Sequence, residues 1–186
     1  MKPSPKAVFI DRDGVLIRDA DYLASTDGLS VFKDSPRALK LLREAGFKIV
    51  IVTNQSGVAR GYFTEAAVKK IHAELKRRLA KAGARWDALY YSPHGPDSGH
   101  SWRKPGTGML LAAKKKFGLD LKSSYMIGDK TSDIECARRA GCASVLVLTG
   151  SAGRDKAFKI KPDAVRRGIL SAARWIIKKN SSNYEA

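Results

Sequence analysis

The most constraining feature of this sequence is a short apolar run that ends in two acidic residues. Residues Ala7 to Ile10 are all apolar, and Asp11, Arg12, Asp13 and Gly14 follow directly. Such a run is typical of a strand covered on both faces of a parallel sheet, and these sheets bind ligands at the carboxyl ends of their strands. Because residues two apart in an extended chain share a face, Asp11 and Asp13 can address one atom, while Arg12 is expected to point elsewhere.

Paired carboxylates indicate chemistry on a charged group. Two anions this close resist ionising together unless a cation or strong hydrogen-bond donors lie between them. A hard divalent metal ion prefers oxygen ligands, and a carboxylate can also act as a nucleophile, forming an acyl-phosphate that water hydrolyses. Taken alone, the stretch is equally compatible with an ordinary acidic turn after a strand. Its interpretation therefore depends on the motifs that follow.

A second polar motif follows the apolar residues at positions 47–52. We predict a strand there, with Thr53, Asn54, Gln55 and Ser56 at its end. A hydroxyl, amides and backbone N–H groups at the end of a strand can hold a phosphate by hydrogen bonds. The stretch is therefore suited to bind a phosphate group.

Two further motifs carry charge. Arg103 and Lys104 precede a proline. A lysine beside a transferred phosphoryl group offsets developing negative charge, and an arginine offers a planar fork to a second phosphate or to hydroxyls. Asp129 and Asp133 follow the apolar residues 125–127 and surround a predicted helix start, where they can hold a cation opposite the first motif. Asp133 can equally be a first-turn residue that interacts with the helix dipole.

The order of these motifs resembles that of the haloacid dehalogenase-like phosphohydrolases. Residues 11–15, 53–57, 103–105 and 128–133 match the four motifs of that superfamily, and the match runs from about Val8 to about Thr149. Within it, the chain is similar to the branch that holds D-glycero-D-manno-heptose 1,7-bisphosphate 7-phosphatase and the histidinol-phosphate phosphatase domain. The resemblance implies a Mg²⁺-dependent phosphate monoester hydrolase that works through an aspartyl-phosphate intermediate.

The resemblance also implies roles for individual residues. Asp11 is the expected nucleophile, and Asp13 the expected acid for the leaving oxygen and then the base for water. The expected magnesium ligands are Asp11, the backbone carbonyl of Asp13 and Asp129. Asp133 is expected to contact these ligands without binding the ion directly, or to bind the ion through a water molecule. Thr53 and Lys104 are expected to bind the phosphoryl oxygens. The expected substrate contacts are Asp19, Asp21, Tyr22, Asn54, Gln55, Ser56, Arg103 and Lys130.

One loop departs from the pattern of the branch. Its members often carry Cys-x-His and then Cys-x-Cys just before Arg-Lys-Pro, a spacing that closes a structural zinc site. This sequence has Ser92, His94, His100 and Trp102 at the corresponding places. Because serine and tryptophan cannot replace thiolates, we expect no structural zinc. The alternative is that His94 and His100 bind a metal with other partners.

Apolar runs that alternate with amphipathic stretches predict a single α/β phosphatase domain over residues 1–186. The expected architecture is a Rossmann-like parallel sheet with helices on both faces and a minimal cap. Residues 17–30 show no sustained periodicity and are expected to form a loop or flap over the end of the first strand. The active site is therefore expected where the strands end.

Caps and apolar spacing set the expected ends of several elements. His72 lies one position from Ile71 on its helix and has no nearby Cys or His, so we expect it at the surface or its boundary. The other expectations are an N-cap at Ser35, an N-cap at Thr64 for a helix to about Ala82, a strand over 86–91, a capping box of Ser132 and Glu135, a helix over 165–177, a frayed polar segment over 178–186, and flexible ends over 1–5 and 180–186.

The chain is strongly basic, with a formal net charge of +17 from 35 Lys and Arg against 18 Asp and Glu. This charge attracts nucleic acid, acidic membranes and phosphorylated metabolites alike. The basic residues are spread along the chain, which favours solvated helix faces over a nucleic-acid groove. The apolar runs fall well below the roughly 18 residues of a membrane span. The sequence starts without a secretory signal, and its two cysteines lack a C-x-x-C arrangement, so we expect a cytoplasmic protein with no membrane partner.

The resemblance favours one substrate and leaves others open. Heptose 1,7-bisphosphate, a small phosphorylated sugar on the way to the nucleotide-activated heptose of lipopolysaccharide, suits a basic site through its second phosphate. Histidinol phosphate is an alternative, because Asp19 and Asp21 can pair with its amine. Two further alternatives for the function are a nucleic-acid 3′-phosphatase and a non-catalytic nucleic-acid-binding module. A monomer is the expectation for this branch.

Overall fold

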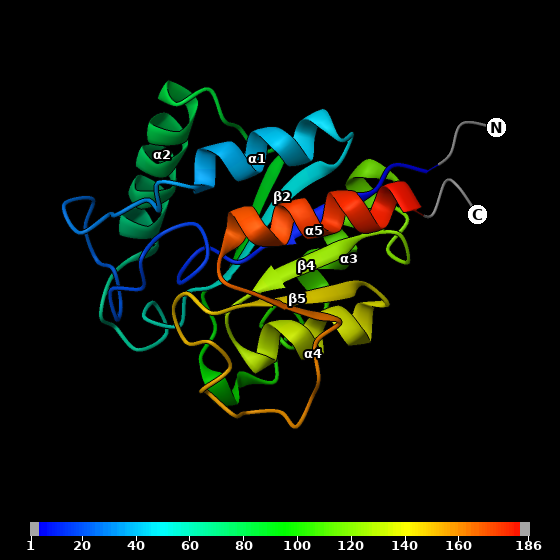
Figure 1. The fold of residues 1–186 in the computed structure, drawn as a ribbon. Helices are drawn as coiled ribbons and strands as arrows, with labels where there is room; N and C mark the ends of the chain where they lie inside the picture. The colour runs from blue at the N-terminus through cyan, green and yellow to red at the C-terminus, as the bar shows by residue number, and fades with distance from the viewer. Residues whose placement is uncertain (1–3, 183–186) are drawn as a thin grey trace.

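The computed structural model describes residues 4–182, and its centre is one parallel sheet (Figure 1). The six strands lie in the order β3-β2-β1-β4-β5-β6. Strand β1 pairs with β2 on one side and β4 on the other, so the order of the strands reverses beside β1. Open sheets bind ligands at such a switch point. The strands are β1 (Ala7–Ile10), β2 (Lys48–Asn54), β3 (Ala88–Ser92), β4 (Tyr125–Gly128), β5 (Ala143–Val147) and β6 (Ala164–Arg166).

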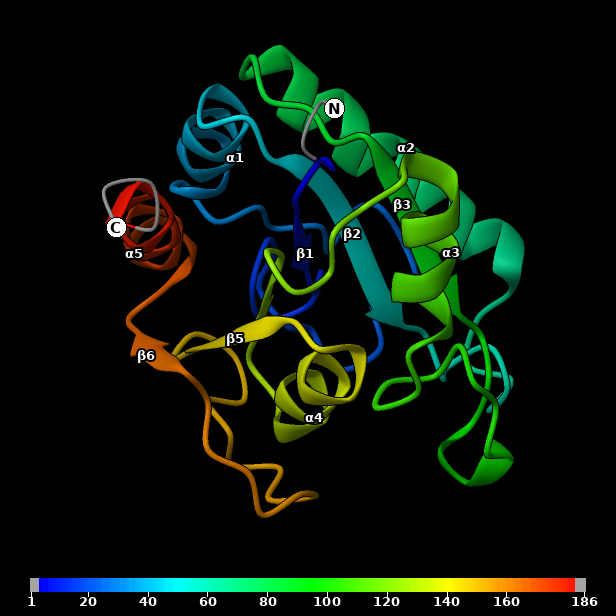
Figure 2. The same ribbon diagram turned by 90° about the vertical axis from the view of Figure 1, so that its right-hand side faces the viewer.

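Helices cover both faces of the sheet, as predicted (Figure 2). Alternate residues of a strand point to opposite faces. In β1, Val8 and Ile10 pack with one group of helices, whereas Ala7 and Phe9 pack with the other. The first group is α1 (Ser35–Glu44), α2 (Glu65–Lys81) and α5 (Ile169–Ser182), and the second is α3 (Gly108–Phe117) and α4 (Thr131–Ala140). A short 3-10 helix, Pro96–Ser98, lies in the loop before α3.

Helix starts follow the expected caps in one case and differ in two. The side chain of Thr64 accepts a hydrogen bond from the backbone N–H of Ala67 at 3.2 Å, as an N-cap does. The predicted N-cap at Ser35 is wrong because Asp34 occupies that position. Ser35 is the first residue of α1, and its hydroxyl donates instead to the carbonyl of Leu16 at 2.8 Å. That bond ties α1 to the loop that follows β1.

The predicted capping box at the start of α4 is also wrong, by two positions. The N-cap is Lys130, whose backbone N–H donates to Asp133 Oδ2 at 3.0 Å. Glu135 instead forms ion pairs with Arg138 and Arg139, both at 2.7 Å. The shift fixes Asp133 within the first turn, where its carboxylate faces the end of β4.

The carboxyl-terminal region holds the largest difference from the expected elements. The helix expected over 165–177 begins only at Ile169, because residues 164–166 form β6. Asp163 accepts hydrogen bonds from the backbone N–H and the hydroxyl of Ser144, at 2.8 and 2.9 Å, which seats the new strand beside β5. Val165, the first residue of the expected helix, is exposed.

The polar segment expected to fray from residue 178 is helical as far as the structure describes it. Helix α5 continues to Ser182, and Lys6 Nζ donates to Asn180 Oδ1 at 2.6 Å. The expected flexibility of 1–5 and 180–186 stays a prediction; positions 1–3 and 183–186 lie outside the described part of the chain. The strand expected over 86–91 is present as β3, shifted toward the carboxyl end.

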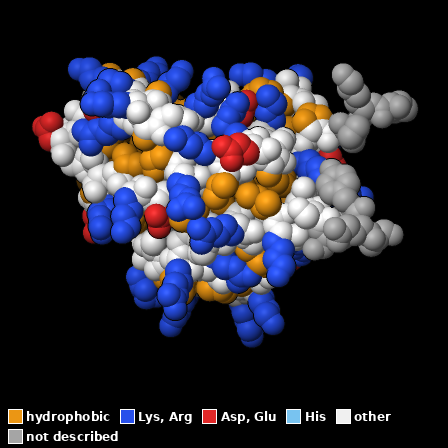
Figure 3. All heavy atoms as spheres, turned by 45° about the horizontal axis from the view of Figure 1, so that its top comes forward, with side chains coloured by type: hydrophobic (Ala, Val, Ile, Leu, Met, Phe, Trp, Pro, Cys, Tyr) orange, Lys and Arg blue, Asp and Glu red, His pale blue; other side chains and the backbone are white. Residues whose placement is uncertain are grey.

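The loop between β1 and α1 forms the minimal cap. Only isolated bridges, from Ile17 to Asp13 and Val31, interrupt its irregular backbone. Buried Leu23 and Leu29 anchor it on the core. No helix within residues 4–182 has the length and apolar character to cross a membrane. Figure 3 shows Lys and Arg side chains scattered over the visible face rather than gathered in one stripe.

The apolar face of α5 gives a test of this packing. Ile176 is fully buried in the core, so Ile176→Ala should lower the free energy of unfolding by about 2–5 kcal/mol in denaturant titrations. The exposed residue Arg174, on the same helix, provides the control: Arg174→Ala should change that free energy by less than about 0.5 kcal/mol. Equal effects of the two substitutions would contradict the docking of α5.

Candidate active site

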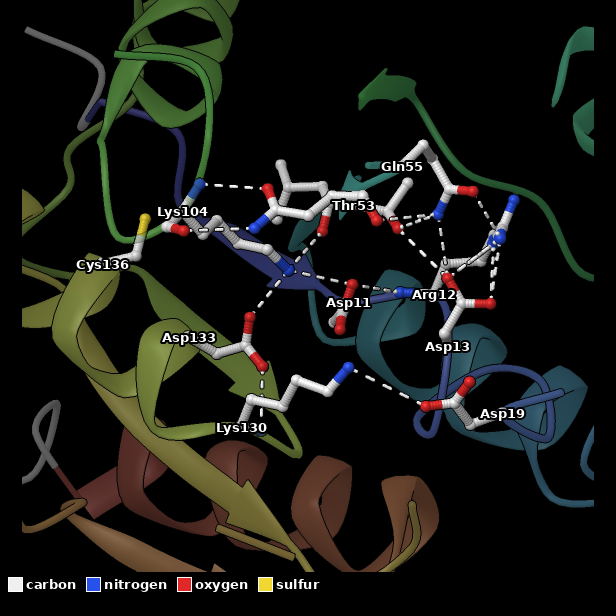
Figure 4. Close-up of polar contacts among 12 residues, drawn as sticks. Asp11, Arg12, Asp13, Asp19, Thr53, Gln55, Lys104, Lys130, Asp133 and Cys136 are labelled. Atoms are coloured by element: carbon white, nitrogen blue, oxygen red, sulfur yellow. Dashed lines mark hydrogen bonds and ion pairs between the residues drawn. The ribbon is translucent and has the colours of Figure 1, made fainter. Parts of the chain in front are cut away.

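The four motifs meet at the carboxyl ends of neighbouring strands (Figure 4). Asp11 follows β1, Thr53 is near the end of β2, and Asp129 follows β4. Lys104 reaches the same place from the loop after β3. A cleft of about 570 Å³ opens above them and is lined by Asp11, Asp13, Thr53, Asn54, Ser56, Arg103, Lys104, Lys130 and Asp133, together with residues of the surrounding loops.

Three buried carboxylates meet at this cleft: Asp11 and Asp133 line it, and Asp129 lies close to both. Asp11, Asp129 and Asp133 each place one oxygen within 4.8 Å of the others. Burial and the charges of Asp11 and Asp133 raise the pKa of Asp129 to about 8. Burial also raises the pKa of Asp11 to about 6, against the opposing charge of Lys104, with Asp133 and Asp13 adding to the increase. Such a cluster is costly to ionise without a cation.

The donor set fits a hard divalent cation. Asp129 Oδ2 accepts a hydrogen bond from the backbone N–H of Ser151 at 2.6 Å. Its other oxygen, Oδ1, is buried and has no hydrogen-bond partner among residues 4–182. A buried carboxylate oxygen without a donor, close to two further carboxylates, is suited to bind Mg²⁺. Asp133, expected behind the metal ligands, lies within this cluster.

Gly14 allows the close approach of Asp129 to the first motif. Its φ of +75° is in the left-handed region, and a Cβ at this position would lie 2.5 Å from Asp129 Oδ2. Any side chain would therefore both strain the backbone and displace the carboxylate.

Lys104 supplies the positive charge at the centre of the site. It is buried, and its Nζ lies 2.9 Å from Asp11 Oδ1 and 2.7 Å from Asp133 Oδ1. Burial alone would lower the pKa of Lys104, but the two carboxylates raise it above its usual value. The amide of Asn54 holds the backbone of Lys104 on both sides: it donates to the carbonyl at 3.1 Å and accepts from the N–H at 3.0 Å. The ammonium group is therefore fixed and charged.

Asp13 faces a different set of partners. Figure 4 shows its carboxylate turned toward Arg12 and Gln55. Arg12 Nη2 lies 2.9 Å from both carboxylate oxygens, and Gln55 Nε2 donates to Oδ2 at 2.9 Å. The hydroxyl of Thr53 lies 3.4 Å from the same oxygen. As expected, Arg12 does not line the cleft that Asp11 and Asp13 share, although its long side chain reaches back to the Asp13 carboxylate.

His72 is also placed differently from expectation. It is buried, with its Nε2 3.0 Å from Arg12 Nη1. Burial and the charge of Arg12 lower the pKa of His72 to about 3. Its spacing of four residues from Val68 and three from Leu75, both buried on α2, was the available signal. No sequence pattern indicated that the partner would be Arg12.

Exposed loop residues form the outer part of the site. Asp19, Asp21 and Tyr22 lie with Asn54, Gln55, Ser56 and Lys130 around a smaller hollow of about 170 Å³. Lys130 Nζ is 3.8 Å from Asp19 Oδ2, a loose ion pair across the mouth. The structure thus brings all the expected substrate contacts except Arg103 around one hollow, although Gln55 is turned inward toward Asp13.

Arg103 forms a positive rim with Arg60. Its guanidinium donates to the carbonyl of His94 at 3.1 Å, and burial together with the nearby charge of Arg60 lowers the pKa of Arg103. Arg60 lies over the ring of Tyr22 at 6.0 Å. Two guanidinium groups that repel each other beside a cleft favour an anionic ligand.

The loop that carries zinc in some members of the branch is held here by other contacts. The rings of His94 and His100 stack with centroids 3.6 Å apart. His100 Nδ1 accepts a hydrogen bond from the backbone N–H of Trp102 at 3.2 Å, and the Trp102 ring packs edge-on against Tyr90. Ser92 is fully buried and cannot provide a thiolate. These residues do not fit a tetrahedral zinc site.

Known proteins are similar in sequence to this chain over most of its length. A family model described as HAD-hydrolase-like matches residues 101–172. The chain is 39% identical over 189 residues to a D-glycero-D-manno-heptose-1,7-bisphosphate 7-phosphatase of Thermosynechococcus vestitus, covering 94% of this chain and 96% of that protein. This chain belongs to the heptose-bisphosphate phosphatase family of haloacid dehalogenase-like hydrolases. The Pseudomonas aeruginosa D-glycero-beta-D-manno-heptose-1,7-bisphosphate 7-phosphatase is 39% identical over 152 residues, 81% of this chain and 85% of that protein.

A solved structure of the heptose-bisphosphate phosphatase family has the same fold. The Bordetella bronchiseptica D,D-heptose 1,7-bisphosphate phosphatase, determined with magnesium and phosphate, superposes with a TM-score of 0.85 at 34% identity. The match covers 94% of this chain and 99% of that chain. The predicted superfamily and branch, the α/β fold and the Mg²⁺ cofactor are thereby confirmed, and the protein is a phosphatase of this superfamily.

Binding of Mg²⁺ should stabilise the protein in a pH-dependent way. In metal-free protein the raised pKa values of Asp11 and Asp129 mean that the folded state holds protons more tightly than the unfolded state, so stability falls as pH rises from about 4 to about 8. Mg²⁺ needs these carboxylates ionised and should raise the melting temperature more at pH 8 than at pH 5. At a hundred times its Kd, Mg²⁺ should add about 2.7 kcal/mol.

Thermal denaturation with Mg²⁺ or with a chelator measures this effect. Asp129→Asn should lose most of the Mg²⁺-dependent increase, whereas Glu44→Gln, an exposed acidic residue on α1, should keep it. An increase of the same size in all three proteins would place the ion elsewhere.

The histidine loop gives a separate prediction. Because its contacts need no metal, elemental analysis of the purified protein should find far less than one zinc per chain, and a zinc-selective chelator should leave the melting temperature in the presence of Mg²⁺ unchanged. Recovery of about one zinc per chain, lost together with stability on chelation, would show that His94 and His100 bind metal with other partners.

Proposed function

We propose that this protein hydrolyses the 7-phosphate of D-glycero-D-manno-heptose 1,7-bisphosphate and so serves the synthesis of lipopolysaccharide heptose. The two relatives named above are called heptose-bisphosphate 7-phosphatases, and each aligns with most of this chain. The observation that supports it most directly is the position of Lys104 Nζ, 2.9 Å from Asp11 and 2.7 Å from Asp133 at the floor of the cleft. A nucleophilic carboxylate and a fixed cation so placed are suited to phosphoryl transfer.

In the first step Asp11 attacks phosphorus. The bond between a carboxylate oxygen of Asp11 and phosphorus forms while the bond from phosphorus to the sugar oxygen breaks. Asp13 gives its proton to that leaving oxygen. Thr53 and Lys104 bind the phosphoryl oxygens and offset the charge that gathers on them. The products of this step are the sugar alcohol and an acyl phosphate on Asp11.

In the second step water hydrolyses the aspartyl-phosphate. Asp13, now ionised, takes a proton from the attacking water, and the bond between Asp11 and phosphorus breaks. Phosphate leaves, and Asp13 is protonated again for the next cycle. Mg²⁺, bound by the carboxylates of Asp11 and Asp129 and by the backbone carbonyl of Asp13, would supply the positive charge that lets an anionic nucleophile approach an anionic ester, with Asp133 close to it.

The outer part of the cleft suits the rest of a bisphosphate sugar. Arg103 and Lys130 line the cleft and are suited to bind a second phosphate, and the charge of Arg60 lies close to Arg103. Asp19, Asp21, Tyr22 and Ser56 are placed to contact sugar hydroxyls. Asn54 and Gln55 act through their contacts with Lys104 and Asp13.

We also propose that the protein works as a monomer in the cytoplasm. Its two cysteines, Cys136 and Cys142, are free and buried, as suits a reducing compartment. The scattered basic side chains favour a solvated surface over a nucleic-acid groove.

The first test is phosphate release with Mg²⁺ by wild-type protein and by Asp11→Asn. The panel holds heptose 1,7-bisphosphate, histidinol phosphate, a 3′-phosphorylated oligonucleotide and p-nitrophenyl phosphate. We expect the wild type to prefer the heptose bisphosphate and Asp11→Asn to release no phosphate. A preference for another compound of the panel would show that the proposed substrate is wrong. Phosphate release by both proteins would contradict the role of Asp11.

Lys104→Ala should slow hydrolysis about a hundredfold or more, since one such electrostatic contact is worth about 2.7–4 kcal/mol. Lys114→Ala, at an exposed lysine on α3, should keep the wild-type rate. Steady-state kinetics measures both, and circular dichroism of Lys104→Ala checks that the variant is folded. A folded Lys104→Ala protein as fast as wild type would contradict the assignment.

A further inference from the structure

A buried polar cluster lies beside Asp13, and Figure 4 shows its members Arg12 and Gln55 on the side away from Lys104 and Asp133. We define it as the Arg12 cluster: Arg12, Gln55 and His72. Arg12 is 1% exposed and is the largest fully buried side chain in the described part of the chain. A buried cation is costly unless it is paired and its hydrogen bonds are satisfied. The cluster therefore needs an explanation beyond packing.

The hydrogen bonds of Arg12 are nearly all used, and they lead to Asp13. Its Nε lies 3.1 Å from Asp13 Oδ2, and its Nη2 lies 2.9 Å from each Asp13 oxygen and from Gln55 Oε1. This forked contact fixes the plane of the carboxylate as well as its position. The Asp13 side chain is only 17% exposed, so little of it remains free to face the cleft.

His72 completes the shell around Arg12. A guanidinium group can only donate hydrogen bonds, so His72 Nε2, 3.0 Å from Arg12 Nη1, must accept, and the ring proton must be on Nδ1. The ring packs edge-on against Tyr91 with centroids 5.5 Å apart, which sets its orientation. An uncharged acceptor fits this place: an apolar side chain would leave an N–H group of Arg12 without a partner, and a carboxylate would compete with Asp13 for the guanidinium.

We propose that Arg12 and His72 are positioning residues for proton transfer: His72 holds the guanidinium of Arg12, which in turn holds the carboxylate of Asp13 at the edge of the cleft. The inference rests on the proposed phosphatase reaction, because it assigns Asp13 the transfer of a proton to the leaving oxygen and from water. Neither Arg12 nor His72 touches the substrate in this scheme. Both act only through Asp13.

The geometry separates this role from substrate binding. Of the two predicted phosphoryl ligands, Lys104 is held by Asn54 and by the carbonyl of Val52 and has no hydrogen bond with the Arg12 cluster among the described residues. Thr53 accepts a hydrogen bond from Gln55 Nε2 at 2.8 Å but has none with His72 or Arg12 among those residues. Loss of the acceptor at position 72 should therefore misplace Asp13 and lower kcat, with little effect on KM. A shift of about 1 Å in a reacting group can cost roughly a hundredfold in rate.

The experiment compares His72→Leu, which removes the acceptor, with His72→Gln, whose amide oxygen can replace Nε2. With Mg²⁺ and heptose 1,7-bisphosphate, we expect His72→Leu to lower kcat about ten- to a hundredfold with KM within about twofold of wild type. His72→Gln should recover most of the loss. Ile71→Val, which perturbs the core at the neighbouring position of α2 without touching Arg12, should keep the wild-type kcat.

The same substitution is then made in Asp13→Asn protein. If His72 acts through Asp13, His72→Leu should cost almost nothing further there, since residues that act as a unit are not additive. An equal loss in both backgrounds, or an unchanged kcat in His72→Leu, would overturn the proposal. If His72→Leu does not fold, Arg12→Lys, which keeps the charge but lacks the fork, is tested in both backgrounds against the same criteria.

Failure of the proposed function gives a different result. If wild-type protein hydrolyses p-nitrophenyl phosphate but not the heptose bisphosphate, the proposed substrate is wrong. The test of Arg12 and His72 can then be made with p-nitrophenyl phosphate. Wild-type protein inactive on every phosphate ester would contradict the phosphatase reaction, and with it the role assigned to the Arg12 cluster.

Discussion

The structure depends on one electrostatic constraint, the burial of three carboxylates around one point. Asp11 follows β1, whereas Asp129 and Asp133 lie around the start of α4, and one oxygen of each lies within 4.8 Å of the others. Such anions repel, so the fold must hold them against their own charge and provide cations nearby. Lys104 is the cation that the chain itself supplies, and the amide of Asn54 fixes its backbone. Mg²⁺ is suited to supply the remaining charge.

The architecture could be predicted because its signals are local. Buried parallel strands are continuous apolar runs, and amphipathic helices repeat at a regular spacing, so each is visible within a short window. The carboxyl-terminal segment shows the limit. Residues 164–166 form a strand because Asp163 binds Ser144, 19 residues earlier in the chain. No window around Val165 contains that contact, and its apolar residues fit a helix equally well.

In the candidate site, too, the positions of individual residues could be predicted, but their hydrogen-bond partners could not. The positions of Asp11, Thr53 and Asp129 at strand ends followed from motifs and topology, and the structure gathers them together with Lys104, which lies on a loop. The partners of Arg12 did not follow, because alternation along a strand predicts the direction of a short side chain only. A guanidinium at the end of a long side chain reaches back to its neighbour and across to His72, 60 residues away.

The arrangement of buried and exposed residues explains how a phosphatase without an inserted cap can combine fixed chemistry with selectivity. The reacting groups and their supports are buried and linked by hydrogen bonds, so their geometry is set by the core and is insensitive to the surface. The residues placed to meet the sugar, Asp19, Asp21, Tyr22 and Arg103, are on loops at the rim. Arg103 is in turn fastened to the carbonyl of His94, within the loop whose histidines stack on each other. Substitutions in that loop can therefore change which phosphate ester is bound while Asp11, Lys104 and the carboxylate cluster stay in place.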